Sequence, residues 1–239
     1  MNTRSGESVT ALRALSEEDF NKLKALDSCS VANAIERFQV QLRNEGFTEG
    51  GLECRFPKMG PVLGYAMTLK VRSSAPPTKS RAFFESTDWW DMLLALPTPR
   101  ILVIQDVDRM PGAGALIGQV HAAILKSLGC VAVVTNGAVR DVPAIAPMGI
   151  QLFSGSLSVS HAYSHMVRAG GAIQIGGLEI LPGDLLHGDC HGFVRVPKEL
   201  ASRIPATASA LDQKERQIID YCQSSSFSVE GLRALLAGE

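Results

Sequence analysis

The sequence predicts an α/β fold, and three observations lead to this prediction. Residues 101–107 (ILVIQDV) are an almost continuous apolar run, as expected of a strand buried on both faces, and residues 131–135 are a second such run. Helical spacing from roughly Ile117 to Gly129 lies between the two runs. A turn at Asn136–Gly137 is expected to end the second strand. Strand, helix and strand in this order indicate a βαβ unit with parallel strands.

The residues before this unit are expected to form helices and one strand. Residues 1–15 are polar and weakly patterned, which indicates a loose arm. Ser16 and the acidic residues after it resemble a capping box that opens a helix, and Ser30 is expected to cap a second helix. Residues 62–72 predict a strand. Thr87 is expected to cap a short helix that ends before the next prolines.

The residues after 150 predict shorter strands that are separated by Gly and Pro, as in antiparallel hairpins. Residues 198–239 are expected to form a helical appendage. No repeat, low-complexity tract or long linker divides the chain, so one domain over residues 1–239 is the simpler interpretation. The expected strands in this part are 151–153, 171–175, 178–181, 184–187 and 193–196.

Composition and charge exclude several classes of function. The formal net charge is −1, whereas nucleic-acid binders usually carry a basic face, so a nucleic-acid partner is not expected. The five cysteines lie far apart and are odd in number, which argues against a disulfide framework. No stretch approaches the roughly 18 apolar residues that predict a membrane span, and no signal peptide is evident. We therefore expect a cytoplasmic protein without membrane partners.

A Gly-rich segment, Gly112–Gln119, follows the first buried strand and leads into the predicted helix. Ligands bind at this carboxyl edge of open α/β sheets, and the N–H groups at a helix N-terminus suit an anion. The spacing matches neither a dinucleotide nor a Walker A motif, so a nucleotide is disfavoured. A turn used only for packing is the alternative, and this segment taken alone favours it.

Arg140 and Asp141 follow the second buried strand and should lie at the same edge as the Gly-rich segment. Arginine offers a planar fork to a carboxylate, and aspartate offers a hard oxygen to Mg²⁺. A surface ion pair or a loop cap is the alternative for an isolated Arg-Asp dipeptide. Their position after a parallel strand favours a site.

The histidines and tryptophans are further candidates for functional residues. His161 and His165 are four residues apart, as are His187 and His191, which have Cys190 between them. Such spacing on a helix would suit zinc, but no HExxH pattern is present and Gly188 interrupts the second pair, so a zinc site is disfavoured. The Trp89–Trp90 pair is expected in the core or in a subunit contact.

Two sequence blocks resemble the RraA-like family, which includes class II 4-hydroxy-4-methyl-2-oxoglutarate aldolases and RraA regulators of ribonuclease E activity. The stronger block is GALIGQVHAAILKSLGCVAVVTNGAVRDVPAI at 114–145, and the second is LEILPGDLLHGDCHGFVRVP at 178–197. The resemblance extends from about Ser28 to Glu215. It implies a single α/β domain with mixed sheets, of the swivelling β/β/α type with terminal helices. It also implies a homotrimer or hexamer with sites between subunits.

The resemblance implies roles for individual residues in a lyase that acts on a pyruvate-like 2-oxo acid. Arg140 would hold the substrate carboxylate, and Asp141 would be the direct ligand of Mg²⁺ or Mn²⁺. The backbone of Gly118, Gln119, Val120 and His121 would hold the same end of the substrate. Glu215 would come from a neighbouring subunit and help to position or activate water. Oxaloacetate decarboxylation would be a natural side activity.

Two positions depart from the aldolase pattern. Gln119 and Ala144 stand where the family's aldolases have carboxylates. Both groups would lie outside the direct metal ligands, where changes can lower metal affinity or activity by roughly 10–100-fold. A regulatory binding module without catalysis is therefore the alternative to the enzyme, and a different lyase or hydrolase on the same metal frame is a third possibility.

Overall fold

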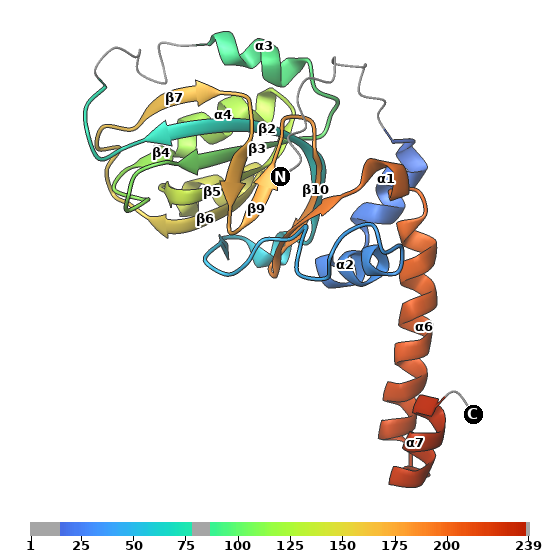
Figure 1. The fold of residues 1–239 in the computed structure, drawn as a ribbon. Helices are drawn as coiled ribbons and strands as arrows, with labels where there is room; N and C mark the ends of the chain where they lie inside the picture. Colours follow the sequence, from blue (N-terminus) through green and yellow to red (C-terminus); the bar gives the residue numbers. More distant parts are fainter. Residues whose placement is uncertain (1–14, 78–86, 238–239) are drawn as a thin grey trace.

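The computed structural model describes residues 15–77 and 87–237, and most of the expected N-terminal arm lies outside these residues. The chain folds as a mixed α/β protein, as the sequence predicts (Figure 1). Within the described residues, nine strands form one mixed sheet whose main order is β1-β6-β5-β3-β2-β10-β11, with β4 paired to β5 and β7 paired to β2. The strands are β1 (Glu53–Cys54), β2 (Val62–Arg72), β3 (Arg100–Asp106), β4 (Ala115–Ile117), β5 (Cys130–Val139), β6 (Gln151–Leu157), β7 (His165–Ala169), β10 (Leu185–Asp189) and β11 (Gly192–Val196).

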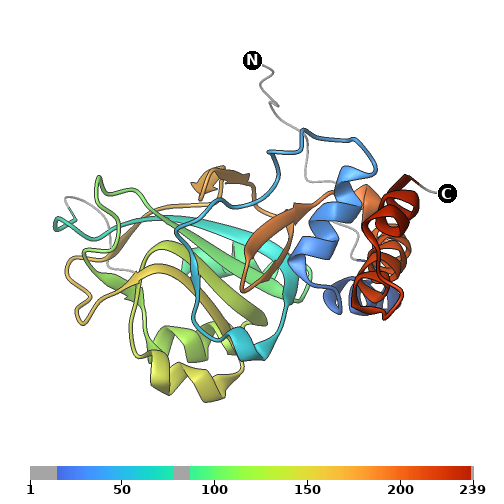
Figure 2. The same ribbon diagram turned by 90° about the horizontal axis from the view of Figure 1, so that it is seen from below.

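The remaining elements are one small hairpin and the helices. The hairpin consists of β8 and β9, which form a separate two-stranded sheet. Helices α3, α4 and α5 cover one face of the large sheet, and α1, α2 and the start of α6 lie at one end (Figure 2). The ranges are β8 (Ile173–Ile175), β9 (Leu178–Ile180), α1 (Glu17–Lys24), α2 (Ser28–Glu36), α3 (Asp88–Leu94), α4 (Gln119–Ser127), α5 (Val142–Ile145), α6 (Ile204–Gln223) and α7 (Val229–Ala237), with short 3₁₀ turns at Pro57–Met59, Ala146–Met148 and Lys198–Leu200.

The centre of the sheet is parallel, and the predicted βαβ unit is confirmed. β3 and β5 pair in parallel with Ile101 opposite Ala132, and α4 connects them. β2 and β6 extend this parallel group on either side. β4 also pairs in parallel with β5, and the remaining pairs, including β10 with β11 and with β2, are antiparallel. The predicted strand at 62–72 coincides with β2.

Three apolar clusters fill the space around the sheet. One packs α3 and α4 against the sheet and includes Trp89, Leu93 and Leu125, so Trp89 belongs to the core. A second cluster lies beneath the β8–β9 hairpin, where the rings of Phe153 and Phe193 meet edge to face with centroids 4.5 Å apart. The third cluster packs α1, α2 and the start of α6 against β2, β10 and β11.

β5 does not end at Asn136–Gly137, contrary to the expected turn. The strand continues to Val139, with an irregular register between Thr135 and Ala138. The side chain of Asn136 replaces a backbone partner, since its Oδ1 accepts from the N–H of Asp106 at 2.7 Å and its Nδ2 donates to the carbonyl of Asp106 at 3.0 Å. The Asn-Gly pair is therefore a strand irregularity within the sheet.

Two of the three expected helix caps, Ser30 and Thr87, were wrong. Asp27, and not Ser30, caps α2, because its carboxylate accepts hydrogen bonds from the N–H and the hydroxyl of Ser30. The spacing of His161 and His165 does not reflect a helix, since His161 lies in the loop before β7 and His165 begins that strand. The cap at Ser16 is confirmed, since its hydroxyl accepts from the N–H of Asp19. Thr87 stands at the start of α3 but makes no side-chain cap.

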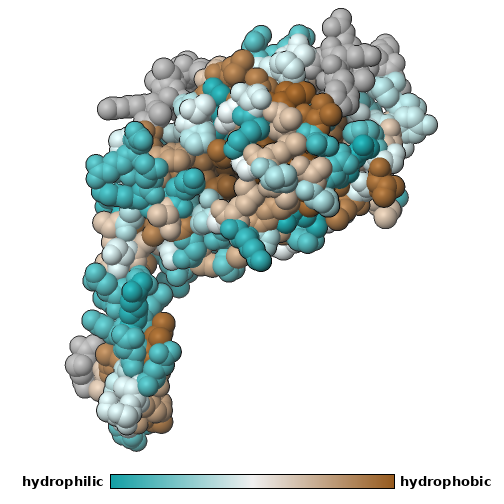
Figure 3. Space-filling view, turned by 180° about the vertical axis from the view of Figure 1, so that it is seen from behind, coloured by the Kyte–Doolittle hydropathy of each residue, from teal (hydrophilic) through white to brown (hydrophobic). Residues whose placement is uncertain are grey.

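The helices expected after residue 198 leave the body of the molecule. Only the first part of α6 is buried, at Ile204 and Ala208, and α7 folds back along its far end (Figure 1). This projection, α6 with α7, has a mostly hydrophilic surface in the view of Figure 3. Among the described residues, no helix combines the length and apolarity needed to span a bilayer.

Candidate functional site

The Gly-rich segment and the Arg140–Asp141 pair meet at one edge of the sheet, as expected. β4 runs parallel to the end of β5, with Ile117 opposite Val139. The N–H of Arg140 donates to the carbonyl of Ile117 at 2.9 Å. This pairing, which the sequence did not reveal, places the start of α4 directly beside Arg140.

The buried carboxylate of Asp106 holds the Gly-rich segment in its conformation through hydrogen bonds. Asp106 is 3% exposed, and its Oδ2 accepts from the N–H of Gly112 at 2.8 Å and from the hydroxyl of Ser73 at 3.4 Å. The Ser73 hydroxyl in turn accepts from the N–H of Gly114 at 3.2 Å. These bonds satisfy backbone groups of a turn that is partly buried, and so they fix its conformation.

Gly118 allows the backbone to approach the pair closely. It is the N-cap residue of α4 and supplies no side-chain cap. A Cβ at this position would lie 2.6 Å from Oδ2 of Asp141 and 3.1 Å from Cγ of Arg140. A side chain here would therefore displace both functional groups.

Asp141 is held in an unusual conformation by two hydrogen bonds. Its φ of 57° lies in the left-handed region, which L-residues rarely adopt. Oδ2 accepts from the N–H of Gln119 at 3.1 Å and from Nε of Arg140 at 3.3 Å. The Gln119 hydrogen bond is the main cause that lowers the pKa of this carboxyl; burial opposes it, and Arg140 and His161 lower the pKa further. Asp141 is thus an anion at neutral pH.

The remaining atoms of the pair are available to a ligand. Within the residues that the structure describes, Oδ1 of Asp141 and both terminal nitrogens of Arg140 make no hydrogen bond. They border an open depression of about 420 Å³. Its lining also includes apolar side chains, among them the exposed Leu157 and Val159. The full lining is Val139, Arg140, Asp141, Val142, Pro143, Leu157, Ser158 and Val159.

Two histidines, His121 and His161, interact with each other near Asp141. His121 is 3% exposed on α4, and burial, with His161 adding to it, lowers its pKa to about 4. His161 is near enough to affect Asp141 as well, and its Nδ1 lies 2.7 Å from the carbonyl of Ala115. The proximity of His161 to Asp141 was not predicted, because the sequence offered only its spacing from His165.

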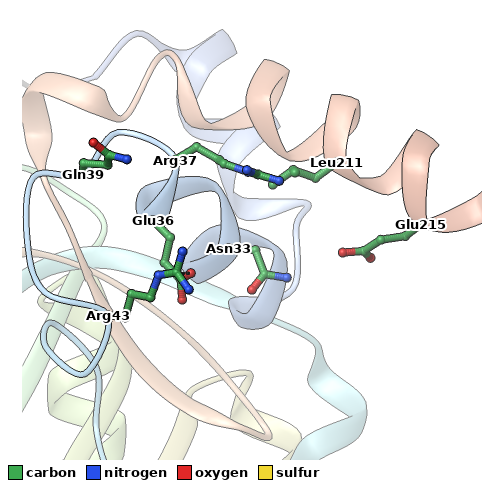
Figure 4. A pocket seen from close by; sticks show the side chains of 7 residues that line it. All are labelled: Asn33, Glu36, Arg37, Gln39, Arg43, Leu211 and Glu215. Atoms are coloured by element: carbon green, nitrogen blue, oxygen red, sulfur yellow. Dashed lines mark ion pairs between the residues drawn. The ribbon is translucent and has the colours of Figure 1, made fainter. Parts of the chain in front are cut away.

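The other predicted site residues fall in two places. Gln119 and Val120 are exposed on the first turn of α4, beside Asp141, and Ala144 lies on the short helix that follows Asp141. Glu215 lies elsewhere, in a pocket of about 330 Å³ between α2 and α6 (Figure 4). Its carboxylate faces Asn33, and the same pocket holds an ion pair of Glu36 with Arg43 at 3.7 Å.

The two pockets share no lining residue. The separation agrees with the expectation that Glu215 would act only in the site of a neighbouring subunit, and that role stays a prediction.

The donor set at Asp141 suits a hard cation. A single carboxylate oxygen is available, and Mg²⁺ commonly takes one or two protein carboxylates and keeps several waters. Gln119 offers a neutral amide nearby, and Ala144 offers no polar group. The residues therefore fit an ion such as Mg²⁺ with few protein ligands.

Comparison with known proteins identifies the family. Residues 28–195 match the RraA-like family, described as aldolase/RraA. The chain belongs to the RraA-like family. Among its relatives, a protein of Halalkalibacterium halodurans named "Putative 4-hydroxy-4-methyl-2-oxoglutarate aldolase" is 25% identical over 178 residues, which are 73% of this chain and 77% of that protein. An uncharacterized protein of Methanocaldococcus jannaschii is 25% identical over 160 residues, covering 66% and 71% of the two chains.

Solved structures with the same fold confirm this architecture. An uncharacterized protein from Pseudomonas syringae pv. tomato superposes with a TM-score of 0.70 at 20% identity, covering 95% of this chain and 97% of the other. Streptomyces coelicolor RraAS2, described as an unusual member of the RNase ES inhibitor RraA protein family, gives a TM-score of 0.65 at 20% identity, covering 87% and 98%. RraA-like proteins thus include both aldolases and regulators on one fold.

Proposed function

We propose that this RraA-like protein is a divalent-metal-dependent lyase that cleaves a carbon–carbon bond in a pyruvate-like 2-oxo acid. The observation that carries the proposal is the pair formed by Arg140 and Asp141. One carboxylate oxygen and two guanidinium nitrogens remain available at the same open depression. The aldolase name of the H. halodurans relative supports the reaction class.

Each residue has a distinct part in this reaction. Oδ1 of Asp141 would hold the ion, and the bound ion supplies positive charge that stabilises the enolate left by bond cleavage. The terminal nitrogens of Arg140 would bind the substrate carboxylate in a bidentate manner. The N-terminus of α4, at Gly118–His121, adds the positive end of a helix dipole beside the same carboxylate.

Proton transfer completes the reaction. Cleavage of a 4-hydroxy-2-oxo acid removes the hydroxyl proton and leaves a carbonyl product with the enolate of pyruvate, which then takes a proton at carbon. Glu215 of a neighbouring copy would position the water that exchanges these protons. Glu215, which Figure 4 shows, would thus act in trans, and we propose a homotrimer or hexamer as the active form.

The proposal is tested with purified protein, Mg²⁺ or Mn²⁺, and a panel of oxaloacetate and several 4-hydroxy-2-oxo acids. Oxaloacetate decarboxylation passes through the same enolate and gives the simplest assay. We expect turnover above the rate with free metal, and loss of that turnover in Asp141→Ala. A wild-type rate equal to that of free metal on every substrate would refute the lyase.

One observation favours a second candidate. Asp141 is the only carboxylate that lines the depression among the described residues, because Gln119 and Ala144 stand where the resemblance implies acidic groups. A regulatory RraA-like module without catalysis would need no such groups. This module would bind its partner equally well with Asp141→Asn, whereas the enzyme would lose turnover.

A further inference from the structure

The turn between β10 and β11 brings three different metal-binding side chains together. Asp189, Cys190 and His191 follow each other in the chain, and one ligand atom from each lies within 4.8 Å of the other two. In the part of the chain that the structure describes, they are the only group of three such residues. Cys190 and His191 are exposed, so the group is open to solvent.

The distances within this group suit a tetrahedral ion. Sγ of Cys190 lies 3.6 Å from Nδ1 of His191, and that nitrogen lies 3.0 Å from Oδ1 of Asp189. Zinc bonds of about 2.3 Å to sulfur and 2.0–2.1 Å to nitrogen, at a tetrahedral angle, separate the two ligand atoms by about 3.6 Å. The oxygen–nitrogen separation needs to widen by only a few tenths of an ångström.

Asp189 is already held in place for such a role. Its side chain is 9% exposed, Oδ2 accepts from the N–H of Ser28 at 2.8 Å, and Oδ1 accepts from the N–H of His191 at 2.9 Å. Burial opposes ionisation of this carboxyl, but these bonds together with His191 lower its pKa. An ion between Oδ1 and Nδ1 of His191 would replace the hydrogen bond that now joins these two atoms.

The surroundings leave room for a further ligand. His191 and Cys29 line the same groove of about 130 Å³, between α2 and the start of β11. Burial raises the pKa of the thiols of Cys29 and Cys54, and the nearby Cys190 and Asp189 raise it further. Three of the five cysteines thus gather from distant parts of the sequence.

His187 is not part of this arrangement. It is fully buried, and its Nδ1 lies 3.0 Å from the hydroxyl of Ser28. The pair of His187 and His191 that the sequence suggested is therefore replaced by three consecutive residues.

We propose that Asp189, Cys190 and His191 form a binding site for a thiophilic divalent ion such as Zn²⁺, with water in the fourth position facing the groove. Mixed sulfur, nitrogen and oxygen ligands favour zinc over Mg²⁺. This site has no residue in common with the depression at Arg140 and Asp141, so it stands apart from the proposed lyase reaction. A bound ion would fix the β10–β11 turn against α2 through Asp189 and Ser28.

The test is a titration of the full-length, reduced protein with Co²⁺, which substitutes for zinc and is visible by absorption. We expect one equivalent with a thiolate-to-cobalt charge-transfer band, which an oxygen site at Asp141 cannot produce. Cys190→Ser should abolish the band, and His191→Ala should weaken binding at least about tenfold, since even groups that only support a ligand contribute that much. Cys222→Ser, an exposed cysteine on α6, is the matched control and should keep the band.

A second measurement, of thermal stability, does not depend on the absorption of cobalt. Zn²⁺ at about 100 times its Kd should raise the Tm of the wild type by roughly 5–10 °C, and Cys190→Ser should lose this shift while its metal-free Tm stays unchanged. No band in the reduced wild type, or a band that persists in Cys190→Ser, would overturn the proposal. A disulfide at Cys190 as the only reaction seen would overturn it too.

Discussion

Oδ2 of Asp141 lies 3.1 Å from the backbone nitrogen of Gln119 and accepts its hydrogen bond. Helices are usually capped by the residue just before them, but the N-cap of α4 is Gly118, which has no side chain to do this. Asp141, which lies 22 positions after Gln119, therefore caps α4. The proposed metal ligand and the anion-binding end of the helix are thus positioned by the same hydrogen bond.

This double role separates two substitutions of Asp141. Asp141→Asn keeps an oxygen for the N–H of Gln119 and tolerates the left-handed backbone, so the free energy of unfolding should change by less than about 1 kcal/mol. Asp141→Ala loses the cap and should be destabilised by about 1 kcal/mol. Both should lose Mg²⁺ or Mn²⁺ binding by calorimetry. If either variant binds the metal as tightly as the wild type, then Mg²⁺ or Mn²⁺ binds at a site other than Asp141.

Arg140 is expected to bind the substrate carboxylate. A charge-assisted hydrogen bond contributes roughly 1.5–3 kcal/mol, so Arg140→Ala should lower kcat/KM at least about tenfold. Lysine keeps the charge without the planar fork, and Arg140→Lys should recover only part of the loss. Steady-state oxaloacetate decarboxylation at saturating Mg²⁺ measures this. Equal rates in the three proteins would show that Arg140 does not bind substrate.

Gly118 can be tested by adding one methyl group. Gly118→Ala would place Cβ 2.6 Å from Oδ2 of Asp141, so the carboxylate must move and both metal affinity and kcat/KM should fall about tenfold or more. Gly50→Ala is the matched control, because a Cβ there meets nothing within 4 Å. If the two variants are equally active, the close approach at Gly118 is not needed.

His121 should make stability depend on pH. Its pKa is about 4 in the folded protein because it is buried, while the unfolded chain takes up the proton near pH 6.5. Between these values the unfolded state binds more protons, so stability falls as pH decreases from 6.5 to 4, by up to about 3 kcal/mol.

Urea unfolding at several pH values measures this effect. His121→Gln should flatten the dependence, whereas His191→Gln, at an exposed histidine, should keep it when no metal is present. Parallel curves for wild type and His121→Gln would assign the pH dependence to other groups.

The position of Glu215 leads us to expect that activity depends on assembly of the oligomer. Its pocket is separate from that of Arg140 within one chain, so only another copy could bring it there. Glu215→Gln should lower kcat without dissociating the oligomer, and sedimentation equilibrium should show a trimer or hexamer. A fully active monomer would exclude Glu215 from the reaction.

The sequence predicted the parallel strands β3 and β5, because β3 and the first half of β5 are apolar runs joined by a helix. It grouped the strand at 151–153 with antiparallel hairpins, whereas β6 pairs in parallel with β5. It did not predict β4, since Ala115–Ile117 is only three residues long and follows a Gly-rich turn. It also misread Asn136–Gly137, because the replacement of a backbone partner by the Asn136 side chain depends on β3 being adjacent.

The candidate site also has features that the sequence predicted and features that depend on tertiary contacts. Arg140 and Asp141 could be placed at the same edge as the Gly-rich segment, because the segment follows one strand of the βαβ unit and the pair follows the other. The role of Asp141 as a cap for α4 could not be foreseen, since it depends on a left-handed backbone at Asp141 and on the bare Cα of Gly118. The metal-binding group of Asp189, Cys190 and His191 could not be predicted from the sequence, because its geometry depends on the β10–β11 hairpin and on Ser28 from α2.

The projection of α6 has a consequence for how this protein migrates in gel filtration. Its 20 residues span about 30 Å, whereas a compact chain of 239 residues has a radius of gyration of about 18 Å. A single copy would therefore show raised friction and elute ahead of a compact protein of the same 25.6 kDa mass. An elution volume calibrated with spherical standards would overstate the number of subunits.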